Sequence, residues 1–135
     1  MINSIKRHFL LIVISLMILS CSNDNETTQI VGQWKLIYRH SNPWSSYIAD
    51  ESAKNIVYDF KSNGILIVTG NQSAPHTDGQ HNYFFGEDIL GGLSSDQKIV
   101  LVKIDGDKWT YNLSSGQMML SQGYLDGESL TFARK

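Results

Sequence analysis

Hydrophobic and polar residues alternate along several short segments of this chain, and a period of two is typical of half-buried β-strands. In the segment GQWKLIYRH the alternation puts Trp34, Leu36 and Tyr38 on one face of a strand and Arg39 on the other. Helix signals are scarce, and strand signals recur at short intervals. We expect about eight strands: one within residues 30–40, a hairpin within 55–70, one within 81–87, three within 98–122 and a last one within 128–134.

Glycine-containing dipeptides separate these segments at Asn63-Gly64, Asp105-Gly106 and Ser115-Gly116. At Asn63-Gly64 we expect a tight hairpin turn in which both residues take a positive φ. Residues 41–53 form a longer connection between the first two strands, and Ser45 to Lys54 are expected to form a short helix there.

An antiparallel meander of eight strands can close into a barrel, which removes the exposed edges of an open sheet. We therefore expect an all-β fold, an up-and-down barrel with one apolar interior. The residues expected to face inward are Trp34, Leu36, Tyr38, Ile56, Tyr58, Phe60, Trp109, Tyr111, Leu113, Met118, Leu120, Leu130 and Phe132. At least one of Tyr83, Phe84 and Phe85 should face outward or lie under a loop, because consecutive residues of a strand alternate.

The first twenty residues have a different pattern. Lys6 and Arg7 precede an apolar run over residues 9–19 that only Ser15 interrupts. About eleven residues are too few to span a bilayer, which takes about twenty, but they suit a secretory signal peptide. Ile18-Leu19-Ser20-Cys21 resembles a bacterial lipobox, which implies cleavage before Cys21 and lipid attachment to its sulfur.

The expected organisation is a lipoprotein signal peptide at 1–20, a flexible polar tether at 21–29 and one domain at 30–135. Without residues 1–20 the remaining 115 residues carry nine basic and thirteen acidic side chains, a net charge of −4. This balance argues against a nucleic-acid partner, which requires a basic surface. Cys21 is the only cysteine, so no disulfide is expected within the domain.

Two short motifs in the domain resemble those of lipocalins. Gly32 and Trp34 match a Gly-x-Trp signature that opens the first strand, and Arg134 matches a basic residue that lies across that tryptophan. Together with the lipobox they resemble short lipocalin-like lipoproteins of the Bacteroidetes. The resemblance implies an eight-stranded barrel closed by Gly32, Trp34 and Arg134, anchored by lipid to a bacterial outer membrane, with a small apolar or amphipathic ligand.

Candidate chemistry is sparse. His76, Asp78 and His81 lack the regular spacing of zinc ligands, so we expect no metal. Asp105 and Asp107 match only half of a calcium loop. Adjacent acids occur at Asp50-Glu51 and at Glu87-Asp88, but neither a nucleophile elbow nor a phosphate-binding loop is present. We expect neither enzymatic activity nor a cofactor.

Two functional hypotheses follow. In the first, a tethered barrel binds a small apolar or amphipathic molecule, and the candidate ligand-binding residues are Trp44, Tyr47, Tyr58, Tyr83 and Tyr111. In the second, bulky side chains fill the barrel, and the domain is a structural or interaction module that contacts another protein of the cell envelope. The volume inside the barrel separates the two hypotheses.

Overall fold

The computed structural model describes residues 29–73 and 75–135, so the expectations for the signal peptide, for Cys21 and for nearly all of the tether lie outside the described residues. Eight strands form the barrel: β1 (Gly32–His40), β3 (Val57–Phe60), β4 (Ile65–Thr69), β5 (Gly79–Ile89), β6 (Lys98–Ile104), β7 (Asp107–Ser114), β8 (Gln117–Ser121) and β9 (Ser129–Arg134). A short strand, β2 (Ile48–Asp50), follows β1, and a 3₁₀ turn, η1 (Gly123–Leu125), precedes β9. The all-β class is confirmed.

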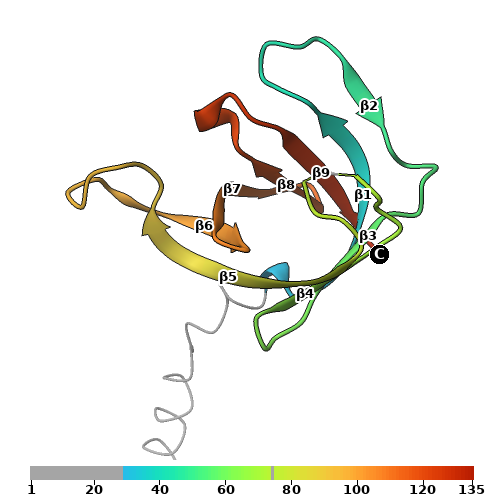
Figure 1. Cartoon of the computed structure of the whole chain (residues 1–135), viewed down its shortest axis with the longest axis horizontal. Helices are drawn as coiled ribbons and strands as arrows, with labels where there is room; N and C mark the ends of the chain where they lie inside the picture. The colour runs from blue at the N-terminus through green and yellow to red at the C-terminus, as the bar shows by residue number, and fades with distance from the viewer. Residues whose placement is uncertain (1–28, 74) are drawn as a thin grey trace, which may run out of the picture.

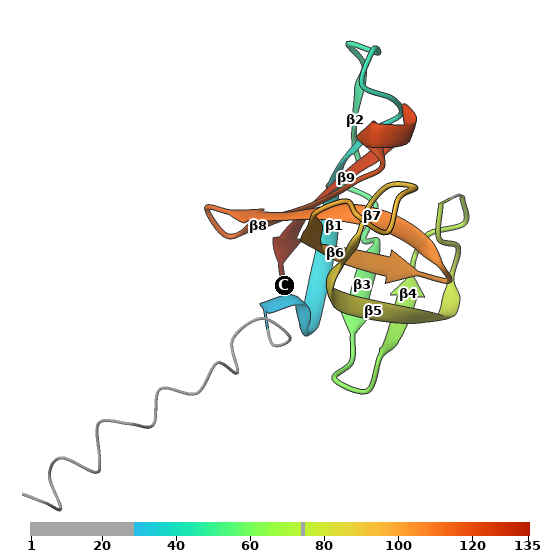
Figure 2. The same cartoon turned by 90° about the vertical axis from the view of Figure 1, so that its left-hand side faces the viewer.

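The barrel closes because β1 pairs with β9, while the other strands pair with their neighbours in sequence. All pairings are antiparallel, which confirms the up-and-down barrel and is consistent with a lipocalin-like fold. β3 and β2 share the second edge of β1: β3 pairs with residues 32–35 and β2 with residues 38–40. β2 therefore extends the wall upward beyond β3 (Figures 1 and 2).

The two ends of the barrel carry different connections. The end where β1 begins, which we call the Trp34 end, carries residues 29–31 and the connections 61–64, 90–97 and 115–116. The opposite end, which we call the mouth end, carries the connections 41–47, 70–78, 105–106 and 122–128. Three of the four mouth-end connections have seven to nine residues, whereas at the Trp34 end only the connection 90–97 is that long.

Two hairpin turns use the dipeptides that the sequence indicated. Asp105 and Gly106 have φ values of 51° and 97°, and Ser115 and Gly116 have 52° and 76°, so both turns take two positive-φ residues. The β3–β4 turn differs, because Gly64 alone has a positive φ, of 82°. The expectation of a positive φ at Asn63 was wrong: its side chain instead accepts a hydrogen bond from the Ile65 amide at 3.3 Å.

Bulky side chains fill the interior as one continuous core. The largest fully buried side chains are Trp34, Trp109, Tyr58, Phe60 and Phe132. Of the residues expected to face inward, Tyr38 was wrong, because it is exposed on the outer face. Leu113 keeps the inward register opposite buried Met118, although it is 41% exposed near the Trp34 end. Phe84 is the outward residue of its triplet, and the Lys103 Nζ lies 4.5 Å from its ring centroid.

The connection between β1 and β3 contains no helix among its described residues, so the expectation of one within Ser45–Lys54 was wrong. Three of these residues form β2 instead. They pair with the free edge of β1 beyond β3, and this pairing satisfies backbone groups that would otherwise lie unpaired.

Candidate functional site

A β-bulge in β1 determines which side chains enter the barrel at the mouth end. The pairing of β1 with β9 shifts register by one residue between Leu36 and Tyr38, which leaves Ile37 as an extra residue. An extra residue reverses the facing of those that follow. Tyr38 is therefore 43% exposed on the outer face, and the Arg39 side chain, 13% exposed, points inward. The alternation had predicted the reverse for both residues.

The outward residues of this part of the sheet surround a half-open hollow, which we call the outer groove. Its volume is about 440 Å³, within the range of roughly 300–1,000 Å³ that is typical of small-molecule sites. Its lining residues are Tyr38, His40, Ile48, Met119, Ser129 and Thr131. They come from β2, β1, β9 and β8, and Figure 2 shows β8 diverging in direction from β1 and β2, so the sheet bends at the groove.

Strand pairing arranges the lining in two cross-strand rows. In the first row His40 on β1 lies between Ile48 on β2 and Ser129 on β9. The second row runs from Tyr38 through Thr131 to Met119. Along each strand these lining residues alternate with residues that point into the barrel. The floor of the groove is therefore the outer surface of the barrel wall. Polar atoms thus lie in the middle of the groove, with Ile48 and Met119 at its two flanks.

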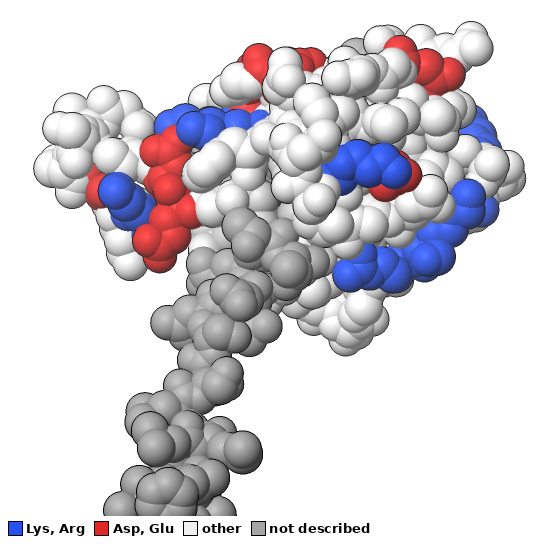
Figure 3. Space-filling model, turned by 90° about the horizontal axis from the view of Figure 1, so that it is seen from below, with Lys and Arg blue, Asp and Glu red and all other residues white. Residues whose placement is uncertain are grey.

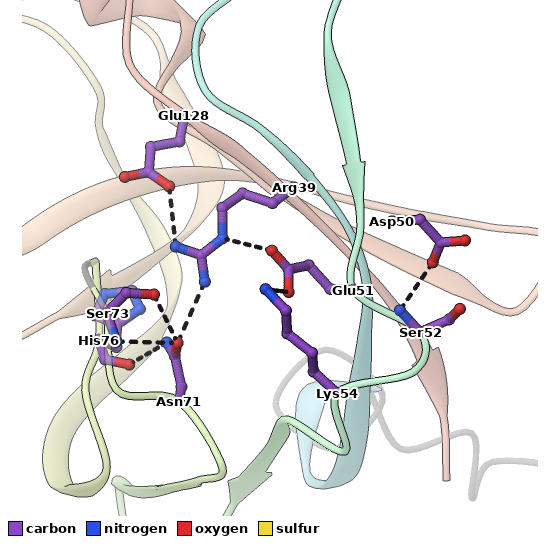
Figure 4. A network of polar contacts seen from close by, with 9 residues as sticks. All are labelled: Arg39, Asp50, Glu51, Ser52, Lys54, Asn71, Ser73, His76 and Glu128. Atoms are coloured by element: carbon purple, nitrogen blue, oxygen red, sulfur yellow. Dashed lines mark hydrogen bonds and ion pairs between the residues drawn. The ribbon is translucent and has the colours of Figure 1, made fainter.

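A polar network surrounds the inward-pointing Arg39 at the mouth end (Figure 4). Because Arg39 lies between Tyr38 and His40 on β1, it is on the opposite face of the strand from the groove. The Arg39 guanidinium is 3.8 Å from a carboxylate oxygen of Glu51 and 3.8 Å from one of Glu128. It also donates a hydrogen bond of 3.3 Å to the Asn71 side chain. Lys54 lies 2.8 Å from the second Glu51 oxygen. The network joins β1, residues 51–54 and the connections 70–78 and 122–128, so it holds two of the mouth-end connections against the wall.

Burial raises the pKa of Glu128, and the positive charge of Arg39 opposes that rise. Arg39 therefore helps to keep this carboxylate ionised where it is partly removed from water.

The connection 70–78 closes the mouth end, because two of its polar side chains are buried. Asn71 donates to the His76 carbonyl oxygen at 2.6 Å, and the His76 ring lies 3.3 Å from the Tyr58 hydroxyl. The same ring packs against Trp109 with centroids 5.2 Å apart. Burial lowers the pKa of His76 to about 4, and nearby His81 adds to the effect, so His76 is neutral at pH 7.

His81 lies beside His76, and both of its ring nitrogens contact oxygen atoms. Its Nδ1 is 2.6 Å from an Asp105 carboxylate oxygen, and its Nε2 is 2.8 Å from the Thr77 carbonyl oxygen. Burial opposes protonation, but these two hydrogen bonds raise the pKa of His81 overall. Within the described ranges no three His, Cys, Asp or Glu side chains gather closely enough to hold a metal ion.

The five candidate ligand-binding residues do not form one site. Trp44, 83% exposed, donates from its ring N–H to Asp126 at 3.2 Å, and Tyr47 is exposed next to β2. Both lie in the connection that leads into the groove residue Ile48.

The other three are directed elsewhere. Tyr58 is fully buried in the core. The Tyr83 hydroxyl donates to the Lys61 carbonyl oxygen at the Trp34 end, and Tyr111 packs against Phe85.

The Trp34 end has the contacts that the Gly-x-Trp resemblance implies. The Arg134 guanidinium lies 4.3 Å from the Trp34 ring centroid and donates to the Val31 carbonyl oxygen at 2.7 Å. The Trp34 ring N–H donates to the Ile30 carbonyl oxygen, also at 2.7 Å. Gly32 has a φ of 122°, and a Cβ there would lie 2.8 Å from an Arg134 nitrogen. These residues pack against one another at this end of the barrel.

Charges elsewhere on the surface are mixed in sign. Over the face seen in Figure 3, basic and acidic side chains are interspersed with larger areas of uncharged surface. The outer groove is therefore the better-defined candidate site, since it combines a concave shape with converging side chains. The sequence could not locate it, because its lining residues come from four strands and depend on the bulge at Ile37.

No protein-family model matches the chain, and neither a curated protein nor a solved structure matches it significantly. In the part of the chain that the structure describes, no helix has the length and apolar character needed to cross a bilayer.

Proposed function

We propose that this protein is a membrane-anchored, lipocalin-like binding module that holds a small amphipathic ligand in the outer groove at the mouth end of its barrel. Cys21 would carry the lipid that tethers the domain to the bacterial outer membrane. The observation that carries the proposal is the groove of about 440 Å³, with polar atoms in the middle and apolar side chains at both flanks. The barrel itself supplies the rigid wall, and binding requires no chemical turnover.

The packed core favours the outside of the wall over the inside as the binding surface. Trp34, Trp109 and Tyr58 occupy the interior, and the connection 70–78 covers the mouth end with buried His76. On the outside, Ile48 and Met119 are 55% and 42% exposed, so a ligand can cover apolar surface that the fold leaves in water. Covering about 100 Å² of such surface contributes about 2.5 kcal/mol.

The experiment is native mass spectrometry of the full chain isolated from its own membranes. We expect a bound small molecule that the variant Thr131→Trp lacks, because an indole at Thr131 fills the groove. Thr69→Trp is the matched control, since Thr69 is an exposed strand threonine on β4, away from the groove. A molecule retained equally by both variants would place binding elsewhere, and a chain that carries no small molecule would contradict the proposal.

A second candidate function is an interaction module for another envelope protein. The exposed aromatic and apolar side chains of the mouth-end connections favour it: Trp44, Tyr47 and Leu125 project into solvent. Aromatic residues are enriched at protein interfaces. Crosslinking in intact cells from a photoreactive residue at position 44 separates the two functions, because a protein adduct is expected only for an interaction module.

A further inference from the structure

We infer that the outer groove takes a neutral saccharide, an inference that rests on the proposed function and names the ligand class for the same site. Four of the six lining residues have a hydroxyl group or an imidazole ring: Tyr38, His40, Ser129 and Thr131. They are contiguous, because His40 lies opposite Ser129 and Tyr38 lies opposite Thr131. The middle of the groove therefore carries several hydrogen-bonding groups, and its lining contains no Asp, Glu, Lys or Arg side chain.

The charges nearest in sequence to the groove are directed away from it or already bonded. Arg39, between Tyr38 and His40, enters the barrel and pairs with Glu51 and Glu128. Asp50, opposite Tyr38, accepts a hydrogen bond from the Ser52 amide at 2.9 Å. An anionic ligand would lose hydration in the groove without gaining an ion pair from its lining, and the Asp50 carboxylate at its edge would repel it. A neutral ligand is therefore favoured over an anionic one.

The polar groups of the groove can both donate and accept hydrogen bonds. The His40 Nε2 contacts the Ser45 carbonyl oxygen, which can only accept, so Nε2 donates and Nδ1 is the ring nitrogen left for a ligand. The Ser129 hydroxyl shares one hydrogen bond of 2.6 Å with Ser121 and has capacity for another. Sugar hydroxyls donate and accept from the same atom, so they match such a mixed set. A hydrocarbon chain would cover these groups without bonding them, which is costly.

The apolar parts of the lining also suit a sugar ring. Tyr38 provides an aromatic ring that is 43% exposed, and Met119 lies in the same cross-strand row. A pyranose presents hydroxyl groups at its rim and C–H groups on its face, so one face can pack on an aromatic ring while the rim bonds to polar groups. The groove offers both kinds of contact within about 440 Å³, which suits a short saccharide.

Two adjacent methionines make the inference testable by NMR on the full chain. Met119 lines the groove, whereas Met118, the next residue, is fully buried in the core. With ¹³C-labelled methionine methyl groups, the Met118 and Met119 signals are assigned by Met118→Leu and Met119→Leu variants, and they report on the two faces of the same strand. The probes are methyl glycosides of glucose, galactose, mannose and N-acetylglucosamine, the disaccharides maltose and lactose, and octan-1-ol and octanoate as apolar and anionic comparisons.

We expect at least one saccharide to shift the Met119 signal in a saturable manner while the Met118 signal stays in place. Thr131→Val should weaken the binding of that saccharide about fivefold to tenfold, as expected for one lost hydrogen bond, and Thr69→Val should leave its affinity unchanged. A saturable shift with octan-1-ol or octanoate but with no saccharide would overturn the inference and leave the proposed function standing. No shift with any probe would also overturn it, and the mass-spectrometry comparison would then decide the proposed function separately.

Discussion

Replacing Arg39 with methionine tests whether the polar network holds the mouth end together. Methionine keeps an apolar stem of similar length but removes the charge, so the carboxylates of Glu51 and Glu128 lose their common partner. Removing one member of a buried ion pair costs about 3–5 kcal/mol. Because the charged atoms are 3.8 Å apart and the Glu128 side chain is 27% exposed, we expect the loss in the free energy of unfolding to lie at the lower end of this range, about 3 kcal/mol. The melting temperature should fall by about 10–20 °C.

The pH dependence of this loss has a definite sign. Burial already raises the pKa of Glu128, and Arg39 opposes the rise, so its removal raises that pKa further. A carboxyl group whose pKa is raised in the folded state destabilises the fold while it is ionised. Protonation removes this destabilisation as the pH falls through that pKa. The difference in free energy of unfolding between the wild type and Arg39→Met should therefore shrink between pH 7 and pH 4.

Urea unfolding followed by tryptophan fluorescence measures both effects. Lys35→Met is the matched control, because Lys35 lies on the outer face of the same strand. If Arg39→Met unfolds at the same urea concentration as Lys35→Met, the network contributes nothing to stability and the reasoning fails. A difference that grows toward pH 4 would show that the carboxylates are not the strained groups.

Two further outcomes are expected. Trp34→Ala should lower the free energy of unfolding by about 3–5 kcal/mol in urea titration, because Trp34 is a buried aromatic under Arg134; an unchanged midpoint would show that it does not close the barrel. For the anchor, Cys21→Ser should abolish incorporation of radiolabelled palmitate in growing cells, since serine lacks the sulfur that receives the lipid. Persistent labelling of that variant would place the lipid on another residue.

The sequence predicted the barrel well because its strands repeat one local rule. Period-two alternation and Gly-containing turns such as Asp105-Gly106 act over a few residues, so they can be recognised without tertiary information. The contact of Arg134 with Trp34 was also expected, although only through a resemblance. Sequence reasoning therefore gave the architecture and one end of the barrel.

The candidate site could not be predicted in the same way. The bulge at Ile37 has no Gly, Pro or Asn to mark it, and it reverses Tyr38 and Arg39 by a shift of one residue. β2 forms only because β1 extends beyond β3, which depends on the lengths of paired strands. The outer groove depends on both features, so it becomes visible only once the register of the whole sheet is known.

The pairing of β1 with β9 has a consequence for how the protein is made. Arg134 bonds to Val31 across 103 positions of sequence, so the ring is completed only by its final segment. Until that segment has been synthesised, β1 keeps an exposed edge that can pair with a neighbouring molecule. A chain released before its last strand is complete should therefore associate with other chains instead of closing its barrel.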